Sequence, residues 1–282
     1  MRWTPGGVSG NIEDRRGGGG FGGRGVGIGG LLLAAVLSLI FGRDFVSPLL
    51  TEGGESQPRI ADQARDRAEE PQVQFVSFVL DDAQNTWRRL LGPRYEDAKL
   101  VLFRDAAQSA CGVAGAESGP FYCPGDRKVY IDLSFFDELD QRFGAPGDFA
   151  QAYVLAHEIG HHVQTLLGIS HEVRQLQAAN PGEANELSVR MELQADCLSG
   201  VWGYSTRERN LLDQGDVQEG LAAAASVGDD RIQRQARGRI NPESFTHGTS
   251  EQRMQWFRRG FESGDIRACD TFEDAESPVS GR

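Results

Sequence analysis

The stretch Ala156-His157-Glu158-Ile159-Gly160-His161-His162 determines how the rest of the sequence is interpreted. It lies within a largely apolar run at 149–167, which the spacing of apolar residues predicts to be a helix. On that helix His157 and His161 stand one turn apart on one face, with Cβ atoms about 5–6 Å apart. Two imidazoles at this separation can bind one zinc ion, and Glu158 at the edge of the same face can take a proton from a water on that ion.

His157, Glu158 and His161 form the H-E-x-x-H pattern that is typical of zinc metalloproteases. The flanking residues Val154 and Val163 are apolar, as a buried metal-binding helix requires. His162 lies about 140° around the helix from His157, too far to join the ligand pair. We therefore expect His162 to orient a neighbouring group or to pack in the core.

A second pair of acidic residues follows on the next predicted helix, at 185–204. Glu192 and Asp196 stand one turn apart there, between apolar residues in which an unpaired carboxylate would be costly. A catalytic zinc ion takes three protein ligands and keeps one position open. Glu192 is the expected third ligand, and Asp196 is expected to accept the remaining ring N–H of His157. The alternative is a pair of solvated carboxylates on a surface helix.

The remaining periodic segments predict an α+β domain, mainly helical with a small antiparallel sheet. Strands come first in the chain and helices after them. The predicted helices are 74–91, 149–167, 185–204, 216–235 and 250–262, and the predicted strands are 99–103 and a hairpin of 121–123 with 128–135.

The N-terminal region predicts a membrane anchor. Residues 1–25 are rich in glycine and arginine, and the following 16 residues carry no charge. As a helix these would span about 24 Å, somewhat less than the roughly 30 Å of a hydrocarbon core, a gap that flanking arginines can bridge by snorkelling. No small-residue cleavage site follows, so an uncleaved anchor at 26–46 is favoured over a signal peptide or a buried core helix.

This anchor predicts a single-pass protein of the bacterial membrane. The arginines upstream of the apolar run place a tail at 1–25 in the cytoplasm and the remainder outside. After the anchor we expect a linker at 47–72, a metallopeptidase domain at 73–270 and a flexible tail at 271–282.

The net charge of −12 and the pI of about 4.9 make nucleic acid an unsuitable partner, because an acidic surface repels phosphate. The expected partners are a peptide or protein substrate and the membrane.

Four cysteines are present, and none forms a C-x-x-C pair, so a thiolate zinc site is not expected. In an oxidising compartment an even number favours two disulfides. Cys111 and Cys123 are the first choice because they close a short loop, and Cys197 with Cys269 then remains. The alternative is four buried thiols in a reducing cytosol.

Several longer stretches resemble the bacterial family of neutral zinc metallopeptidases. This resemblance covers nearly the whole chain, and it implies a zincin-like zinc peptidase domain behind one N-terminal membrane anchor. The matching stretches are Met1-Arg2-Trp3, Glu13-Asp14-Arg15-Arg16-Gly17, Phe121-Tyr-Cys-Pro124, His157-Glu-Ile-Gly-His-His-Val-Gln164, Glu192-Leu-Gln-Ala-Asp196 and His247-Gly-Thr-Ser-Glu-Gln-Arg253.

A looser similarity to membrane zinc proteases of the HtpX and CAAX-processing kind concerns His247. Those proteins carry a T-H-P segment with an arginine six residues after its histidine, and this chain has Thr246-His247 and Arg253, with Gly248 in place of proline. By analogy His247 would donate a hydrogen bond to the developing oxyanion and Arg253 would hold it in place. The alternative is a helix cap with Ser250 as N-cap and Arg253 in a surface ion pair.

The sequence thus predicts a membrane-anchored peptidase with one Zn²⁺ per chain, in which Glu158 is the general base. By analogy with such proteases, the substrate would lie along 128–135 as an edge strand. Two alternatives remain, which are a catalytically silent zinc-binding scaffold and a zinc amidase acting on cell-wall peptides.

Overall fold

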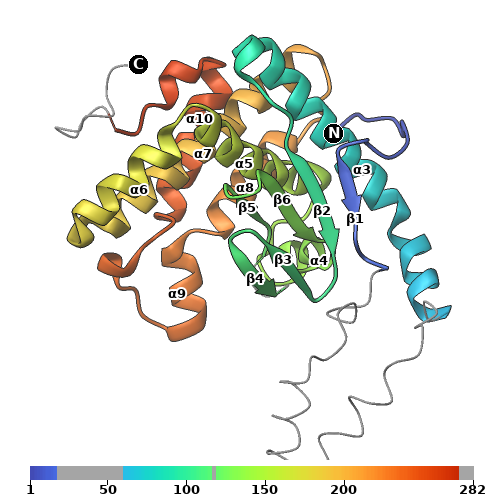
Figure 1. Cartoon of the computed structure of the whole chain (residues 1–282), viewed down its shortest axis with the longest axis horizontal. Coiled ribbons are helices and arrows are strands. Elements are labelled where there is room, and N and C mark those ends of the chain that lie inside the picture. The colour runs from blue at the N-terminus through green and yellow to red at the C-terminus, as the bar shows by residue number, and fades with distance from the viewer. Residues whose placement is uncertain (18–59, 116–118, 273–282) are drawn as a thin grey trace, which may run out of the picture. The chain divides into compact units, whose positions relative to one another are not determined.

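The computed structural model describes residues 1–17, 60–115 and 119–272 (Figure 1). The chain forms two compact units, one of Met1–Asp14 with Pro71–Arg282 and one of Arg15–Glu70. The sequence suggested a different division, with residues 1–25 as a tail apart from the domain. Residues 1–14 instead share a unit with that domain.

The predicted anchor at 26–46 lies outside the described residues. Within the described ranges, no helix is long and apolar enough to cross a membrane. The last part of the predicted linker is helical, because α3 (Ile60–Leu91) begins there and continues through the helix predicted at 74–91. At the other end of the chain, Phe272 was assigned to a flexible tail, but its side chain is only 1% exposed and packs in a small apolar cluster.

The main sheet has four strands in the order β1 (Ile12–Asp14), β2 (Lys99–Phe103), β6 (Lys128–Asp132) and β5 (Phe121–Cys123). β1 and β6 both run parallel to β2, and β5 is antiparallel to β6. The sheet is therefore mixed, whereas an antiparallel sheet was expected. The antiparallel pair β3 (Ala106–Ser109) and β4 (Gly112–Gly115) forms a second, two-stranded sheet.

The predicted hairpin is present, but its second strand is not an edge. β6 lies between β2 and β5, so the prediction of 128–135 as the edge strand was wrong. The strand also ends early, because Asp132 accepts hydrogen bonds from the backbone N–H and the hydroxyl of Ser134, where α4 (Ser134–Gln141) begins. In the described sheet, β5 is the edge on this side.

The helices predicted at 149–167, 185–204 and 250–262 are found with bounds shifted by a few residues, and the fold is mainly helical with small sheets. The segment predicted as one helix at 216–235 is two helices that are separated at Gly228, where a Cβ atom would lie 2.3 Å from the backbone nitrogen of Ser250. The remaining helices are α5 (Asp148–Leu166), α6 (Ile169–Ala179), α7 (Ala184–Glu208), α8 (Asp216–Ser226), α9 (Asp229–Arg237) and α10 (Ser250–Ser263).

Helix α5 lies at the centre of the helical part, with 14 of its 19 residues buried. It packs against α7 and α8, and α7 packs closely on α10. Two glycines make that last contact possible: a Cβ on Gly260 would lie 1.9 Å from the carbonyl oxygen of Cys197, and one on Gly200 would lie 2.1 Å from that of Phe257. The backbones of α7 and α10 therefore touch directly.

Both predicted disulfides are confirmed. Cys111–Cys123 connects the turn between β3 and β4 to β5, and Cys197–Cys269 connects α7 to the 3₁₀ turn Ile266–Cys269 after α10. Their separations of 12 and 72 residues correspond to about 3 and about 4 kcal/mol from loop closure in the unfolded chain.

The crossing of α7 and α10 gives a test of this packing. Gly260→Ala is expected to lower the free energy of unfolding by at least about 2 kcal/mol, because the added methyl group forces two backbones apart. Gly182→Ala is the matched control, since a Cβ there meets nothing within 4 Å. Urea unfolding of both variants measures the difference, and equal stability would contradict the close crossing.

Candidate metal centre

Helix α5 carries the two histidines of the motif toward α7. Their ring centroids lie 4.8 Å apart. Gly160 stands between them in the sequence, and a Cβ there would lie only 3.0 Å from the carbonyl oxygen of Ala195 on α7. The small residue thus lets the two helices approach closely beside His157 and His161.

That close approach brings Glu192 of α7 between the two rings. One carboxylate oxygen of Glu192 lies 3.2 Å from Nε2 of His157, and the other lies 3.3 Å from Nε2 of His161. The donor atoms of all three residues lie within 4.8 Å of one another. Tetrahedral zinc with bonds near 2.0–2.1 Å separates its ligand atoms by about 3.3 Å. The donor set and its spacing therefore fit a zinc ion.

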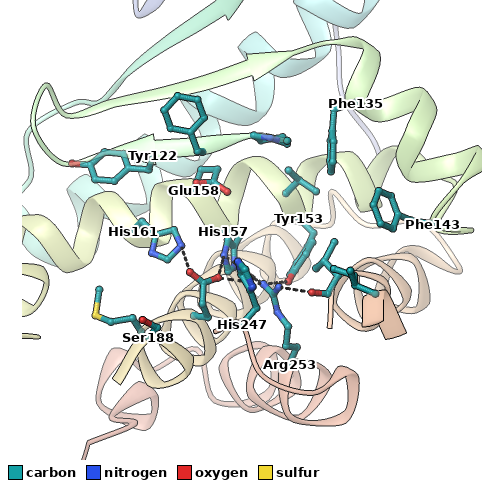
Figure 2. A pocket seen from close by; sticks show the side chains of 18 of the residues that line it. Tyr122, Phe135, Phe143, Tyr153, His157, Glu158, His161, Ser188, His247 and Arg253 are labelled. Carbon is teal, nitrogen blue, oxygen red and sulfur yellow. Dashed lines mark hydrogen bonds and ion pairs between the residues drawn. The ribbon is translucent and has the colours of Figure 1, made fainter. Parts of the chain in front are cut away.

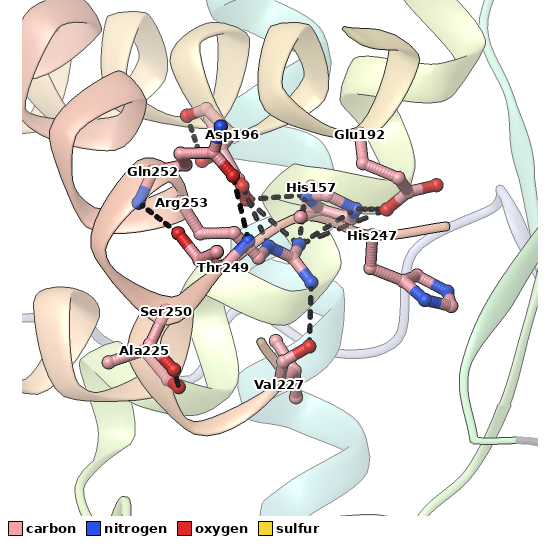
Figure 3. Close-up of polar contacts among 12 residues, drawn as sticks. His157, Glu192, Asp196, Ala225, Val227, His247, Thr249, Ser250, Gln252 and Arg253 are labelled. Atoms are coloured by element: carbon pink, nitrogen blue, oxygen red, sulfur yellow. Dashed lines mark hydrogen bonds and ion pairs between the residues drawn. The ribbon is translucent and has the colours of Figure 1, made fainter. Parts of the chain in front are cut away.

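Asp196 orients His157, as the sequence predicted. Nδ1 of His157 lies 2.9 Å from Oδ1 of Asp196, and because a carboxylate only accepts, this ring nitrogen carries the proton. Nε2 is therefore the ring nitrogen that can bind a metal, once it has lost its own proton. Asp196 is fully buried, and it also accepts hydrogen bonds from the Tyr153 hydroxyl and from Nε of Arg253 at 2.8 Å (Figure 3).

His161 has an orienting partner that the sequence analysis missed. Nδ1 of His161 lies 2.8 Å from the amide oxygen of Gln164, one turn further along α5. The amide nitrogen of Gln164 donates to the carbonyl oxygen of Met191 at 2.7 Å and to Gln194 at 3.1 Å, both on α7. The i, i+3 spacing from His161 was the available signal, since it puts Gln164 on the same helix face.

Ion pairs within the cluster shift the pKa values of its members. Burial alone would lower the pKa of His157, but Asp196 and Glu192 outweigh it and raise that pKa to about 9. Burial would likewise raise the pKa of Glu192, yet the two histidines hold it well below its usual range. Protons and a metal ion thus compete for the same nitrogen atoms.

Glu158 lies beside the two histidines in the same cleft (Figure 2). Its side chain is buried, and burial raises the pKa of its carboxyl group, opposed by His161 and His157. A raised pKa brings a carboxylate closer to the range in which it can both accept and return a proton near neutral pH.

His247 lines this cleft as well, but its partner is not the predicted one. The backbone N–H groups of Thr246, His247 and Gly248 all donate to Oδ2 of Asp229, and Nδ1 of His247 lies 3.2 Å from Oδ1 of Asp229. This hydrogen bond raises the pKa of His247. The prediction that Arg253 holds His247 was wrong, because the guanidinium group bonds Asp196 and the His247 ring points away from it (Figure 3).

The helix-cap alternative for this segment also differs from the structure. Thr249, not Ser250, is the N-cap of α10, and it forms a capping box with Gln252. Arg253 is only 3% exposed, so it is not part of a surface pair. Gly248 has φ of 87°, which proline cannot adopt, and the local turn therefore differs from that of a T-H-P segment.

His162 packs away from the ligand pair, as expected from its position on the helix. Nδ1 lies 3.0 Å from the Tyr122 hydroxyl, and Nε2 lies 2.6 Å from the carbonyl oxygen of Glu96. These contacts link α5 to β5 and to the segment before β2.

The three metal donors, Glu158 and His247 border a cleft of about 980 Å³. Strand β5 contributes Phe121 and Tyr122, and α5 contributes His157, Glu158 and His161. The cleft is large enough for several residues of a peptide.

The role of Gln164 can be tested through metal affinity. Gln164→Leu is expected to weaken zinc binding about 10–100-fold, because His161 loses the group that fixes its ring orientation. Gln175→Leu on the exposed side of α6 is the control. Competition with a fluorescent chelator measures both, and unchanged affinity in the Gln164 variant would exclude this role.

Comparisons with known proteins show the family of the chain. Residues 1–272 match the family described as "putative neutral zinc metallopeptidase". The chain is 48% identical over 285 residues to the uncharacterized protein YpfJ of Escherichia coli K12, which covers 96% of this chain and 99% of that protein. It is 46% identical over 201 residues to the uncharacterized protein Rv2575 of Mycobacterium tuberculosis, with 67% of each chain covered. No solved structure matches. The chain therefore belongs to the neutral zinc metallopeptidase family.

Proposed function

We propose that this protein hydrolyses peptide bonds with one zinc ion per chain, held by His157, His161 and Glu192. The observation that carries the proposal is the spacing of the three donor groups, with each carboxylate oxygen of Glu192 3.2–3.3 Å from one histidine Nε2. The second nitrogen of each ring is already hydrogen-bonded, to Asp196 and to Gln164. Both histidines are therefore oriented for a metal before it binds.

Zinc bound there would act as a Lewis acid, lowering the pKa of a coordinated water and polarising the substrate carbonyl. Glu158 is the base in this proposal. It accepts a proton as the water oxygen attacks the carbonyl carbon, and it returns that proton to the amide nitrogen as the C–N bond breaks. The buried setting and raised pKa of its carboxyl group support both steps.

His247 is proposed to donate a hydrogen bond to the oxyanion that forms on the carbonyl oxygen. Support comes from its place in the cleft and from Asp229, which holds both its backbone and its ring. The bond to Asp229 also favours the protonated imidazolium, which has a proton to donate on its other nitrogen. Asp229 takes the positioning role that the sequence analogy gave to Arg253.

Strand β5 is the proposed docking edge for an extended substrate. Among the described strands, β5 pairs only with β6, and its residues Phe121 and Tyr122 border the cleft. Backbone hydrogen bonds along such an edge bind a peptide with little dependence on its side chains.

Two substitutions separate metal binding from catalysis. Glu158→Gln is expected to retain zinc but to lose at least about 100-fold in kcat, because the amide cannot accept the proton. Glu192→Ala is expected to lose zinc and activity together. Zinc content by atomic absorption and cleavage of a diverse peptide library, with products identified by mass spectrometry, measure both effects in the full chain.

The same experiment, with cell-wall peptide fragments added as substrates, distinguishes the alternatives. Cleavage retained by Glu158→Gln would exclude Glu158 as the base. Zinc bound without cleavage of peptides or cell-wall fragments would favour a binding scaffold. Products cut only at cell-wall amide bonds would identify an amidase on the same ligands.

The role of His247 has its own prediction. His247→Ala is expected to lower kcat about 100- to 1,000-fold while zinc content stays unchanged, as for loss of one oxyanion donor. Because the His247 ring is half exposed, removing it is not expected to unfold the protein, and a lower kcat would report the lost hydrogen bond. His171→Ala on α6 is the matched surface control, and equal kcat in the two variants would contradict the role.

A further inference from the structure

The two ends of the cleft differ in chemistry. On one side of Glu158 lie Phe135 and Phe143, and Ser188 lies on the other side (Figure 2). The first end is completed by apolar groups of α5 and α9, which are Val154 and Ile232. The second end carries more polar groups, which are Thr165, Ser170, Arg174, Gln177 and Ser188, together with the apolar side chains of Val173 and Met191.

The aromatic end is formed by neighbouring rings. The ring centroids of Phe135 and Phe143 lie 6.3 Å apart, and those of Phe135 and the buried Phe136 lie 6.4 Å apart. Both Phe135 and Phe143 are only partly buried, so each has ring surface left to cover. Covering aromatic surface with another apolar group is favourable in proportion to the area removed from water.

Charged groups near this end neutralise each other. Glu138 and Arg142 of the cleft wall form an ion pair at 3.3 Å, one helical turn apart. A charged substrate side chain placed between the rings would lose water without gaining a free partner. The composition of this end therefore favours an apolar side chain over an acidic or basic one.

We propose that this end of the cleft is a specificity pocket for a large apolar side chain, such as phenylalanine or leucine, next to the bond that is cleaved. The proposal rests on the peptidase function above and adds the substrate class. Phe135 and Phe143 are its specificity-determining residues, and the polar end imposes a weaker preference.

Binding tests this pocket independently of turnover. Four dipeptide hydroxamates are titrated calorimetrically into the zinc-loaded full chain. They differ only in one side chain, which is that of phenylalanine, leucine, aspartate or lysine. The apolar compounds are expected to bind at least about tenfold more tightly than the charged ones. Phe143→Ala is expected to remove most of that difference, whereas Ser188→Ala at the polar end retains it.

Each outcome decides one question. Equal affinity for all four hydroxamates, or no binding of any, overturns the pocket. Preferential binding of the apolar compounds without cleavage of any peptide leaves the pocket in place and overturns the peptidase function. Cleavage of peptides with no preference for apolar side chains overturns the pocket and leaves the peptidase function in place.

A separate observation concerns residues 1–14, which are built into the domain. β1 pairs with β2 in parallel register, with Ile12 opposite Leu100. The ring centroids of Trp3 and Phe75 lie 5.3 Å apart. Nζ of Lys128 donates a hydrogen bond to Oε1 of Glu13 at 2.6 Å.

These contacts join residues 1–14 to a strand, an aromatic ring and a charged side chain of the domain, and none of them can form across a hydrocarbon layer of about 30 Å. We infer that residues 1–14 and 71–272 lie on the same side of any membrane. This arrangement is incompatible with the single-pass topology predicted from the sequence, in which one crossing at 26–46 separates the two.

Cysteine labelling tests the inference in the full chain. Val8→Cys and Val113→Cys place single thiols at positions that are 52% and 57% exposed, one in each part. Spheroplasts are treated with a membrane-impermeant maleimide before and after permeabilisation, with the unsubstituted chain as background. Labelling of both sites, or protection of both until permeabilisation, is expected. Labelling of only one site in intact spheroplasts would overturn the inference.

Discussion

The buried carboxylate of Asp196 joins the three helices that make the site. It belongs to α7, bonds the His157 ring on α5 and the Tyr153 hydroxyl one turn earlier, and pairs with Arg253 on α10 at 2.8 Å. Asp196 and Arg253 depend on each other. Removing one partner of a buried ion pair leaves the other charge unpaired and lowers the free energy of unfolding by about 3–5 kcal/mol. The orientation of a metal ligand is thereby coupled to the packing of the helical core.

The two close helix crossings make this coupling possible. Gly160 lets α7 approach α5 beside the histidines, and Gly200 with Gly260 lets α10 approach α7. Because α5 and α7 approach closely, the carboxylate of Glu192 on α7 reaches both histidine rings on α5, and the metal donors are held at distances that zinc requires. The site is therefore rigid through its helices, while His247 comes from a connecting segment fixed by Asp229.

Local spacing in the sequence predicted the donor set and not its surroundings. His157 with His161, and Glu192 with Asp196, are one turn apart, so helical geometry alone places each pair on a face. The partner of His247 depends on how α9 packs against the segment before α10, and no local pattern encodes that. The edge strand was misjudged for the same reason, since β6 pairs with the distant β2 as well as with β5 and is therefore a central strand. The disulfides were predictable because few pairings were available.

Anomalous diffraction at the zinc edge, from crystals of the full chain grown with zinc, tests the central claim most directly. The account predicts one peak per chain, about 2.0–2.1 Å from Nε2 of His157 and of His161 and about 2.0–2.2 Å from a carboxylate oxygen of Glu192, with a fourth position open to the cleft. A peak at any other residues, or a fourth protein ligand that closes the site, would contradict it.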